Sequence, residues 1–195
     1  MLRDLRLVAK GGSGWFAPET DFPHPLLVPA MDEAARKKTL RMVPYALYLL
    51  GTRRVQPKGP EDLHAHVVSW VSQCSFKPPM IMVAMQKGSL GLELVNESRV
   101  FTLNFLGADQ KALAQKFFKT IERTGGHFSG HPYELGKQTG CPVFPESPAT
   151  IKCAVDDIIE HENDHAVVLA RVVDVAHRRD AMPLTHRETG WAYAG

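Results

Sequence analysis

The sequence has little cysteine, no long apolar run and no large excess of charge of either sign. Its three cysteines, Cys74, Cys141 and Cys153, are widely spaced and form no CxxC pair, which argues against a disulfide framework and a structural zinc site. This cysteine usage predicts a reducing, cytoplasmic setting. No apolar stretch approaches the roughly 20 residues that span a bilayer, and no signal-peptide core precedes Gly11. We therefore expect no membrane partner.

Charge and short motifs exclude further classes of function. The 23 basic and 21 acidic residues give a formal net charge of +2, so we expect no nucleic-acid partner and only local binding of anions. There is no GxGxxG fingerprint, no Walker A loop and no GxSxG elbow. His161 to His165 match HExxH, but Ile158 and Ile159 before them and the apolar run after them predict a hairpin around Asn163 and Asp164. A hairpin separates the two histidines, so we expect no metal there.

The length of 195 residues suits one domain with a sizeable core. Residues 1–30, rich in glycine and proline, predict an extended N-terminal arm, and residues 31–195 the folded domain. We expect a helix over residues 32–42, strands over 45–52 and 98–106, and a helix from Asp109. Residues 120–148 predict a long connection that serves as a lid or a dimer contact.

The stretch from Ser69 to Ser89, SWVSQCSFKPPMIMVAMQKGS, is the most informative part of the chain. Residues 67–76 predict a strand with polar residues on both faces, which indicates hydrogen bonding to a planar, polar ligand; an edge strand facing water is the alternative. Met80 to Met85 predict a central strand covered on both faces.

Ser89 is placed to cap a short helix that begins at Leu90. Lys87 lies just before this cap, where a cation is unfavourable unless an anion lies between it and the helix. A bound phosphate would resolve the conflict, and a solvated lysine beside an ordinary cap is the alternative.

The chain resembles the flavin reductase-like, FMN-binding split barrels over about residues 40–193. The segments that carry the resemblance are MVPYALYLLGT, HVVSWVSQCSFKPPMIMVAMQKGS, SRVFTLNFLGADQ, LAQKFF, TIKCAVDDIIEHENDHAVVLARVVDV as a closing hairpin and PLTHRETGWAY as a terminal strand. The resemblance implies a mainly β fold with flanking helices, built as a six-stranded antiparallel split barrel. It also implies a homodimer with flavin at or near the dimer interface.

Carried over by residue, the resemblance implies a ring-facing and a phosphate-facing group. Ser69, Trp70 and Val71 would line the flavin ring, and Ser75 would reach toward the ribityl chain or phosphate. The phosphate would be held by Lys87, Gly88 and Ser89, and His165 would lie near the nicotinamide as the catalytic residue. Many relatives carry Asn, Ser and Phe where this chain has residues 69–71, and Thr at position 91, where this chain has glycine.

The implied function is that of an NAD(P)H-dependent flavin reductase. FMN is the expected cofactor, with FAD as the alternative, and NADH or NADPH is the hydride donor. Electrons would pass to a monooxygenase or other acceptor protein, or leave with reduced flavin. Two alternatives are a non-enzymatic, flavoredoxin-like FMN electron carrier and a haem-binding split barrel that uses His64, His66 or His127.

Overall fold

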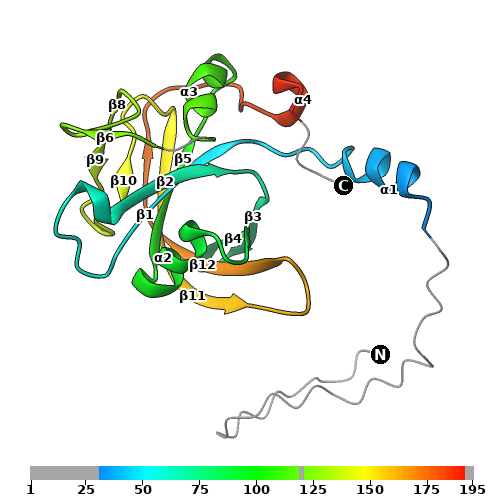
Figure 1. Cartoon of the computed structure of the whole chain (residues 1–195), viewed down its shortest axis with the longest axis horizontal. Helices are drawn as coiled ribbons and strands as arrows, with labels where there is room; N and C mark the ends of the chain where they lie inside the picture. The colour runs from blue at the N-terminus through cyan, green and yellow to red at the C-terminus, as the bar shows by residue number, and fades with distance from the viewer. Residues whose placement is uncertain (1–30, 119–120, 192–195) are drawn as a thin grey trace, which may run out of the picture.

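The computed structural model describes residues 31–118 and 121–191. The arm predicted over residues 1–30 lies outside the described residues. The fold is mainly β, as predicted, and its main sheet is antiparallel throughout, with strand order β2-β1-β5-β11-β12-β4-β3 (Figure 1). The strands are β1 Tyr48–Arg53, β2 Leu63–Val68, β3 Val71–Phe76, β4 Pro79–Gln86, β5 Val100–Phe105, β11 Ala149–Ile159 and β12 His165–His177. The sheet therefore has seven strands where six were expected.

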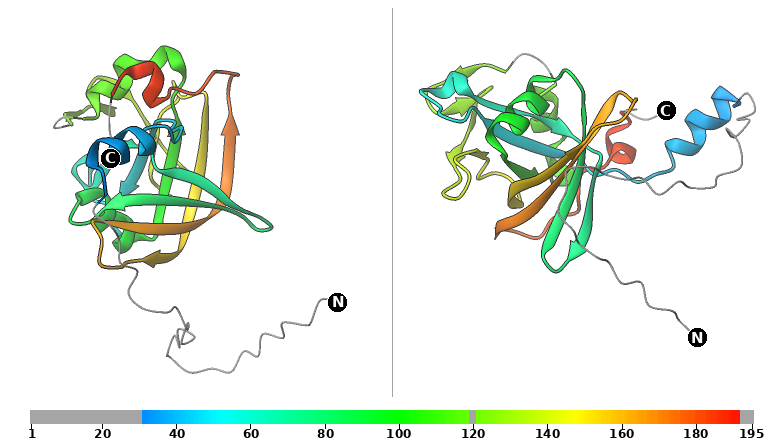
Figure 2. Two further views of the ribbon diagram at one scale, coloured as in Figure 1. Left: turned by 90° about the vertical axis from the view of Figure 1, so that its right-hand side faces the viewer. Right: turned by 90° about the horizontal axis from the view of Figure 1, so that it is seen from below.

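The extra strand arises from a break at Ser69 and Trp70. The single strand predicted over residues 67–76 was wrong, because β2 ends at Val68 and β3 begins at Val71. These two strands are the opposite edges of the main sheet. The two-residue link thus carries the chain from one edge to the other, and the curled sheet is seen in Figure 2.

Strand β4 is interior in the sheet, but it is not covered on both faces. It pairs with β3 on one side and β12 on the other, which confirms its central position. Val83 and Met85 are buried, whereas Met82 is 41% exposed. The alternation shows that one face is covered and the other is open, so the prediction of full burial was wrong.

The hairpin predicted around Asn163 is confirmed. β11 and β12 pair antiparallel, and His161 lies in the turn while His165 opens β12. Register shifts between Lys152 and Cys153 and between Val155 and Asp157 interrupt the ladder. Such bulges bend long strands, which helps β11 to pair with β5 while β12 pairs with β4.

The helices flank the sheet. They are α1 Glu33–Leu40, α2 Leu90–Ser98, α3 Lys111–Lys116 and α4 His186–Thr189, with 3-10 turns η1 Pro60–Asp62 and η2 Ala108–Gln110. Asp32 caps α1, which buries no residue, and Figure 1 shows it standing away from the sheet. The terminal strand expected in PLTHRETGWAY was wrong. Only isolated bridges at Pro183 and Thr185 form before α4.

The long connection after α3 contains regular structure of its own. Five two-residue strands form two small sheets: β6 Arg123–Thr124, β7 His127–Phe128, β8 His131–Pro132, β9 Glu134–Leu135 and β10 Pro142–Val143. Phe128 and Phe144 from this segment are buried with Phe117 in one of two apolar cores. The segment is therefore a packed part of the domain.

The second core fills the curled sheet beneath α2. Phe101, Leu103 and Val168 from the strands pack there with Leu92 and Val95 of the helix. Across the described ranges, no helix has the length and apolar character needed to cross a membrane. The cavity described next is lined by residues of both cores.

Candidate functional site

A cavity of about 300 Å³ lies where β2, β4 and the start of α2 meet. Its volume is at the lower end of the range for small-molecule sites. The residues that line it come mainly from the end of β2, the second half of β4 and the C-terminal region: Leu47, His66, Val67, Val68, Ser69, Ala84, Met85, Gln86, Ser89, Phe118, His186 and Trp191. The wall is largely apolar, with a few hydroxyl, amide and imidazole groups.

Two serines at opposite ends of the Ser69–Ser89 stretch meet at this cavity. Ser69 is buried at the link between the sheet edges. Ser89 is the N-cap of α2, and its Oγ accepts a hydrogen bond of 3.3 Å from the Leu92 amide, as predicted. Gly88 has φ of 73°, a value that favours glycine and turns the chain from β4 into the helix. The fold thus brings together residues that are 20 positions apart.

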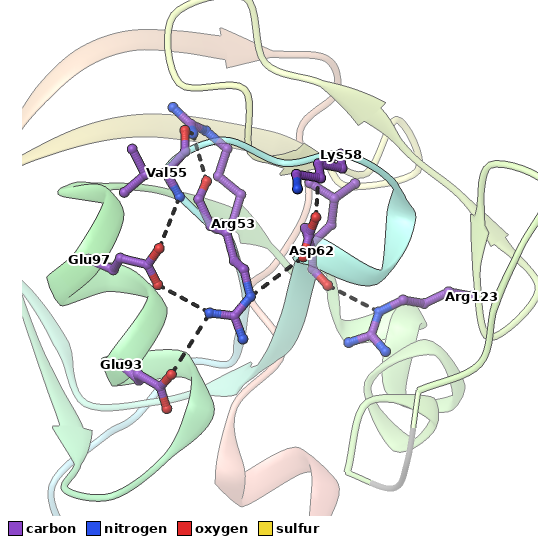
Figure 3. Close-up of polar contacts among 9 residues, drawn as sticks. Arg53, Val55, Lys58, Asp62, Glu93, Glu97 and Arg123 are labelled. Carbon is purple, nitrogen blue, oxygen red and sulfur yellow. Dashed lines mark hydrogen bonds and ion pairs between the residues drawn. The ribbon is translucent and has the colours of Figure 1, made fainter.

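The outer face of α2 is tied to the loop after β1 (Figure 3). Glu97 and Glu93 lie 3.3 Å and 4.0 Å from Nη1 of Arg54, whose Nε is 3.5 Å from Asp62. The Val55 amide also donates to Glu97. These exposed pairs are individually weak, but together they link α2 to the loop after β1.

Lys87 and Gly88 do not line the cavity. The Lys87 ammonium donates to the carbonyl of His161, and the Lys87 amide donates to the carbonyl of Asp164 at 2.9 Å. Lys87 therefore joins β4 to the turn of the β11–β12 hairpin. Its position just before the capped helix is the one expected from the sequence.

The other predicted residues, Trp70, Val71, Ser75 and His165, do not line the cavity. The Trp70 ring packs on His165, with the ring centroids 4.6 Å apart. Val71 and Ser75 lie on the edge strand β3, where the ladder shifts register between Gln73 and Ser75. The structure therefore brings Ser69 and Ser89 to the cavity and groups Trp70 with His165.

His165 is held from two sides. Its Nδ1 lies 2.9 Å from the Asp164 carboxylate, and its ring packs on Trp70. The hydrogen bond with His165 holds the pKa of Asp164 below its usual value. Asp164 thus stays ionised near neutral pH and fixes the orientation of the imidazole.

Sequence reasoning gave no flavin-site role to five polar or aromatic residues in the wall, namely His66, Gln86, Phe118, His186 and Trp191; of these, only His66 was named, as a candidate for the haem alternative. Gln86 is adjacent to the Lys87 turn and was within reach of the sequence argument. His186 and Trp191 come from the segment that was expected to be a strand. Two further cavities of about 780 and 700 Å³ are also lined by Trp191.

The remaining histidines and cysteines form no metal centre in the described part of the chain. No group of three or more His, Cys, Asp or Glu side chains is placed to hold an ion. All three cysteines are unpaired, and burial raises the pKa of Cys141 and of Cys153 to about 12. The buried thiols of Cys141 and Cys153 are therefore protonated and unreactive at neutral pH.

The fold defines a class of protein: an antiparallel split barrel, here with a cavity between the end of β2, β4 and the start of α2. The family model described as "Flavin reductase like domain" matches residues 40–194. The chain therefore belongs to the flavin reductase like family, and the resemblance seen in the sequence is confirmed.

Relatives agree with this placement. An NADPH-flavin oxidoreductase of Streptomyces viridifaciens is 30% identical over 143 residues, which cover 70% of each chain. An NADH-dependent FMN reductase of Agrobacterium fabrum is 29% identical over 131 residues, 66% of this chain and 68% of that one. A Rhizobium meliloti relative, named "Probable flavin reductase", is 32% identical over 98 residues, but the match covers 50% of this chain and only 30% of that protein.

Solved structures share the fold at lower identity. The flavin reductase of styrene monooxygenase from Pseudomonas putida S12 has a TM-score of 0.63 and 22% identity, over 82% of this chain and 96% of that one. An NADH:FAD oxidoreductase of Streptomyces globisporus also has a TM-score of 0.63, with 18% identity, over 80% of this chain and 93% of that one. At this identity the likeness establishes the fold.

Proposed function

We propose that the chain is an NAD(P)H-dependent flavin reductase that binds FMN at the cavity between Ser69 and Ser89. The observation that carries the proposal is this cavity, which lies inside the family match and has apolar walls with polar groups at its ends. FAD is the alternative flavin, because the Streptomyces globisporus neighbour is named an NADH:FAD oxidoreductase.

Bound flavin supplies a ring that accepts a hydride from the nicotinamide, so the chain needs no nucleophile of its own. Ser69, Trp70 and Val71 form the ring-facing group, and Ser75 extends it along β3. Lys87, Gly88 and Ser89 form the phosphate-facing group before α2. His165, oriented by Asp164 and packed on Trp70, positions the nicotinamide as the catalytic residue.

The purified protein tests the proposal directly. We expect a yellow protein or, after FMN addition, saturable quenching of flavin fluorescence. Anaerobic addition of NADH or NADPH then bleaches the flavin absorbance, and the faster donor is the physiological one. A colourless protein that fails to quench FMN contradicts the flavin assignment.

A second role, as an electron carrier, is favoured by a specific relative. A diflavin flavoprotein of Synechocystis is 28% identical over 160 residues, yet the match covers only 27% of that protein. There the matching region is one part of a larger flavoprotein. Weak bleaching by both nicotinamides, with rapid reduction by a protein donor, distinguishes a carrier from a reductase.

The acceptor of electrons is a separate protein in our proposal. Neighbours of the same fold are named as the flavin reductase of a styrene monooxygenase and as the flavin reductase component of a tryptophan halogenase. We therefore expect a flavin-dependent oxygenase or halogenase partner. Adding such a partner should consume the reduced flavin that this chain produces.

We also propose a homodimer in the cytoplasm. Exposed apolar side chains occur on three strands that neighbour one another in the sheet, namely Phe76 on β3, Met82 on β4 and Val175 on β12, and in this proposal two copies pair through these strands. The free Cys141 and Cys153 favour a reducing compartment. Phe76→Asp should shift the mass measured by light scattering from dimer to monomer.

A further inference from the structure

His66 is a polar residue in the wall of the cavity that no assigned role explains. It lies on β2, half-buried, and lines the cavity together with Ser69 and Ser89. Its Nδ1 is enclosed and has no hydrogen-bond partner among the residues that the structure describes. An enclosed polar atom without a partner costs free energy. The Nδ1 of His64 is in the same state, but of the two histidines it is His66 that lines the cavity, where a ligand can meet the ring.

Gly91 makes room for this imidazole. A Cβ atom at position 91 would clash with Cε1 of His66, so any larger residue would displace the ring. The glycine lies in the first turn of α2, two residues after the Ser89 cap. The His66 ring therefore rests against the start of the helix, where the backbone favours an anion.

The surroundings of His66 keep its ring uncharged. Burial, followed by the neighbouring His64, lowers the pKa of His66 to about 3, and the two rings stack with centroids 5.1 Å apart. Burial and the charge of Arg123 likewise lower the pKa of His64 to about 4. A neutral imidazole has one N–H donor and one acceptor, so His66 can offer a donor to a ligand without carrying a charge itself.

We propose that His66 binds the phosphate end of the flavin by donating an N–H hydrogen bond to it, next to the Ser89 cap. The proposal rests on the proposed function, because the phosphate is that of FMN. It adds a residue to the phosphate-facing group and makes His66 a determinant of selectivity for FMN over riboflavin, which has the same ring without the phosphate.

The experiment compares His66→Phe with the matched control His64→Phe. Both replace an imidazole on the same strand by an aromatic ring without a donor, and His64 does not line the cavity. Dissociation constants for FMN and riboflavin are measured by fluorescence quenching. We expect His66→Phe to raise the dissociation constant of FMN about tenfold or more, which is the effect of losing one hydrogen bond to a charged group. The dissociation constant of riboflavin should stay within about twofold of its wild-type value. His64→Phe should preserve the wild-type ratio of the two constants.

Two further variants keep the result independent of folding. His66→Gln retains an N–H donor and should restore most of the FMN affinity, whereas Gly91→Ala displaces the ring without removing it and should lower the FMN affinity selectively. Equal losses for FMN and riboflavin, or an unchanged FMN constant in His66→Phe, overturn the proposal while flavin binding stands. A wild-type protein that binds neither flavin overturns both this proposal and the proposed function.

Discussion

The cavity wall and the hairpin turn hold two histidines under opposite conditions. His66 is enclosed, stacked on His64, and has a pKa lowered to about 3. His165 lies beside an ionised carboxylate, with its Nδ1 2.9 Å from Asp164. The same type of side chain is thus held as a neutral hydrogen-bond donor in the cavity wall and as an imidazole oriented by a carboxylate at the start of β12. Burial beside His64 in one case and the Asp164 carboxylate in the other cause this difference.

A substitution that fills the cavity should have the largest effect on FMN binding of all the variants proposed for the cavity wall and the β11–β12 hairpin. Ala84→Phe places a ring in the cavity wall. It should lower the affinity for FMN about ten- to a hundredfold, because the added side-chain volume must displace either the ligand or the residues of the wall. Leu135→Phe, at an exposed position on β9 outside the cavity, is the control. Titration by fluorescence quenching measures both variants, and equal affinities would place the flavin elsewhere.

The enclosed state of His66 should appear in the pH dependence of stability. Its folded pKa of about 3 lies below the unfolded value of about 6.5, so the unfolded chain binds the extra proton as the pH falls. The free energy of unfolding is therefore fully retained above pH 6.5 and falls below it.

His66→Gln removes this proton-binding site from both states. As the pH falls from about 6 to 4, the free energy of unfolding of the wild type should decrease by about 1.4 kcal/mol per pH unit more than that of the variant. Urea denaturation at a series of pH values measures the difference, in which other titrating groups cancel. Parallel curves for the two proteins would contradict an enclosed, neutral His66.

His165, the first residue of β12, should affect binding of the nicotinamide rather than binding of the flavin. His165→Ala removes the ring that packs on Trp70 and should raise KM for NAD(P)H about two- to tenfold, the size of an aromatic contact. The flavin constant should not change. Steady-state kinetics test this, with His161→Ala, an exposed residue of the adjoining hairpin turn, as the control. An unchanged KM removes His165 from the site.

Lys87 should give the smallest effect. The Lys87 ammonium donates to the His161 carbonyl, and Lys87 does not line the cavity. Lys87→Glu should therefore lower the affinity for FMN, relative to the affinity for riboflavin, by only about two- to fivefold, because solvent screens the charge. The ratio of the FMN and riboflavin dissociation constants should change less in Lys87→Glu than in His66→Phe. Equal losses for both flavins would confine Lys87 to joining β4 to the hairpin.

The parts of the site that local chemistry determines were predictable from the sequence. The Ser89 cap and the β11–β12 hairpin follow from short patterns, and the interior position of β4 follows from its apolar run. The break at Ser69 was not predictable in this way. Residues 67–71, VVSWV, carry no glycine or proline, and only the pairing of β2 and β3 with different strands requires the chain to turn there.

The role proposed for His66 was hidden for a different reason. In the sequence, His64 and His66 indicate at most two ligands of a metal or haem site. The enclosure of His66 depends on Gly91 in another element, and on the curling of the sheet that brings β2 to the start of α2. Contacts of this kind are tertiary, so composition and spacing do not reveal them.

The two-residue link at Ser69 and Trp70 has a consequence for motion. β2 and β3 each lack a partner on their outer side in the main sheet, so the backbone there has fewer bonds to hold it than in the interior strands. A molecule in the cavity touches the end of β2 and the neighbour of β3 at once. Bound flavin would thus hold the end of β2 against β4, the neighbour of β3, and slow amide exchange along both edge strands.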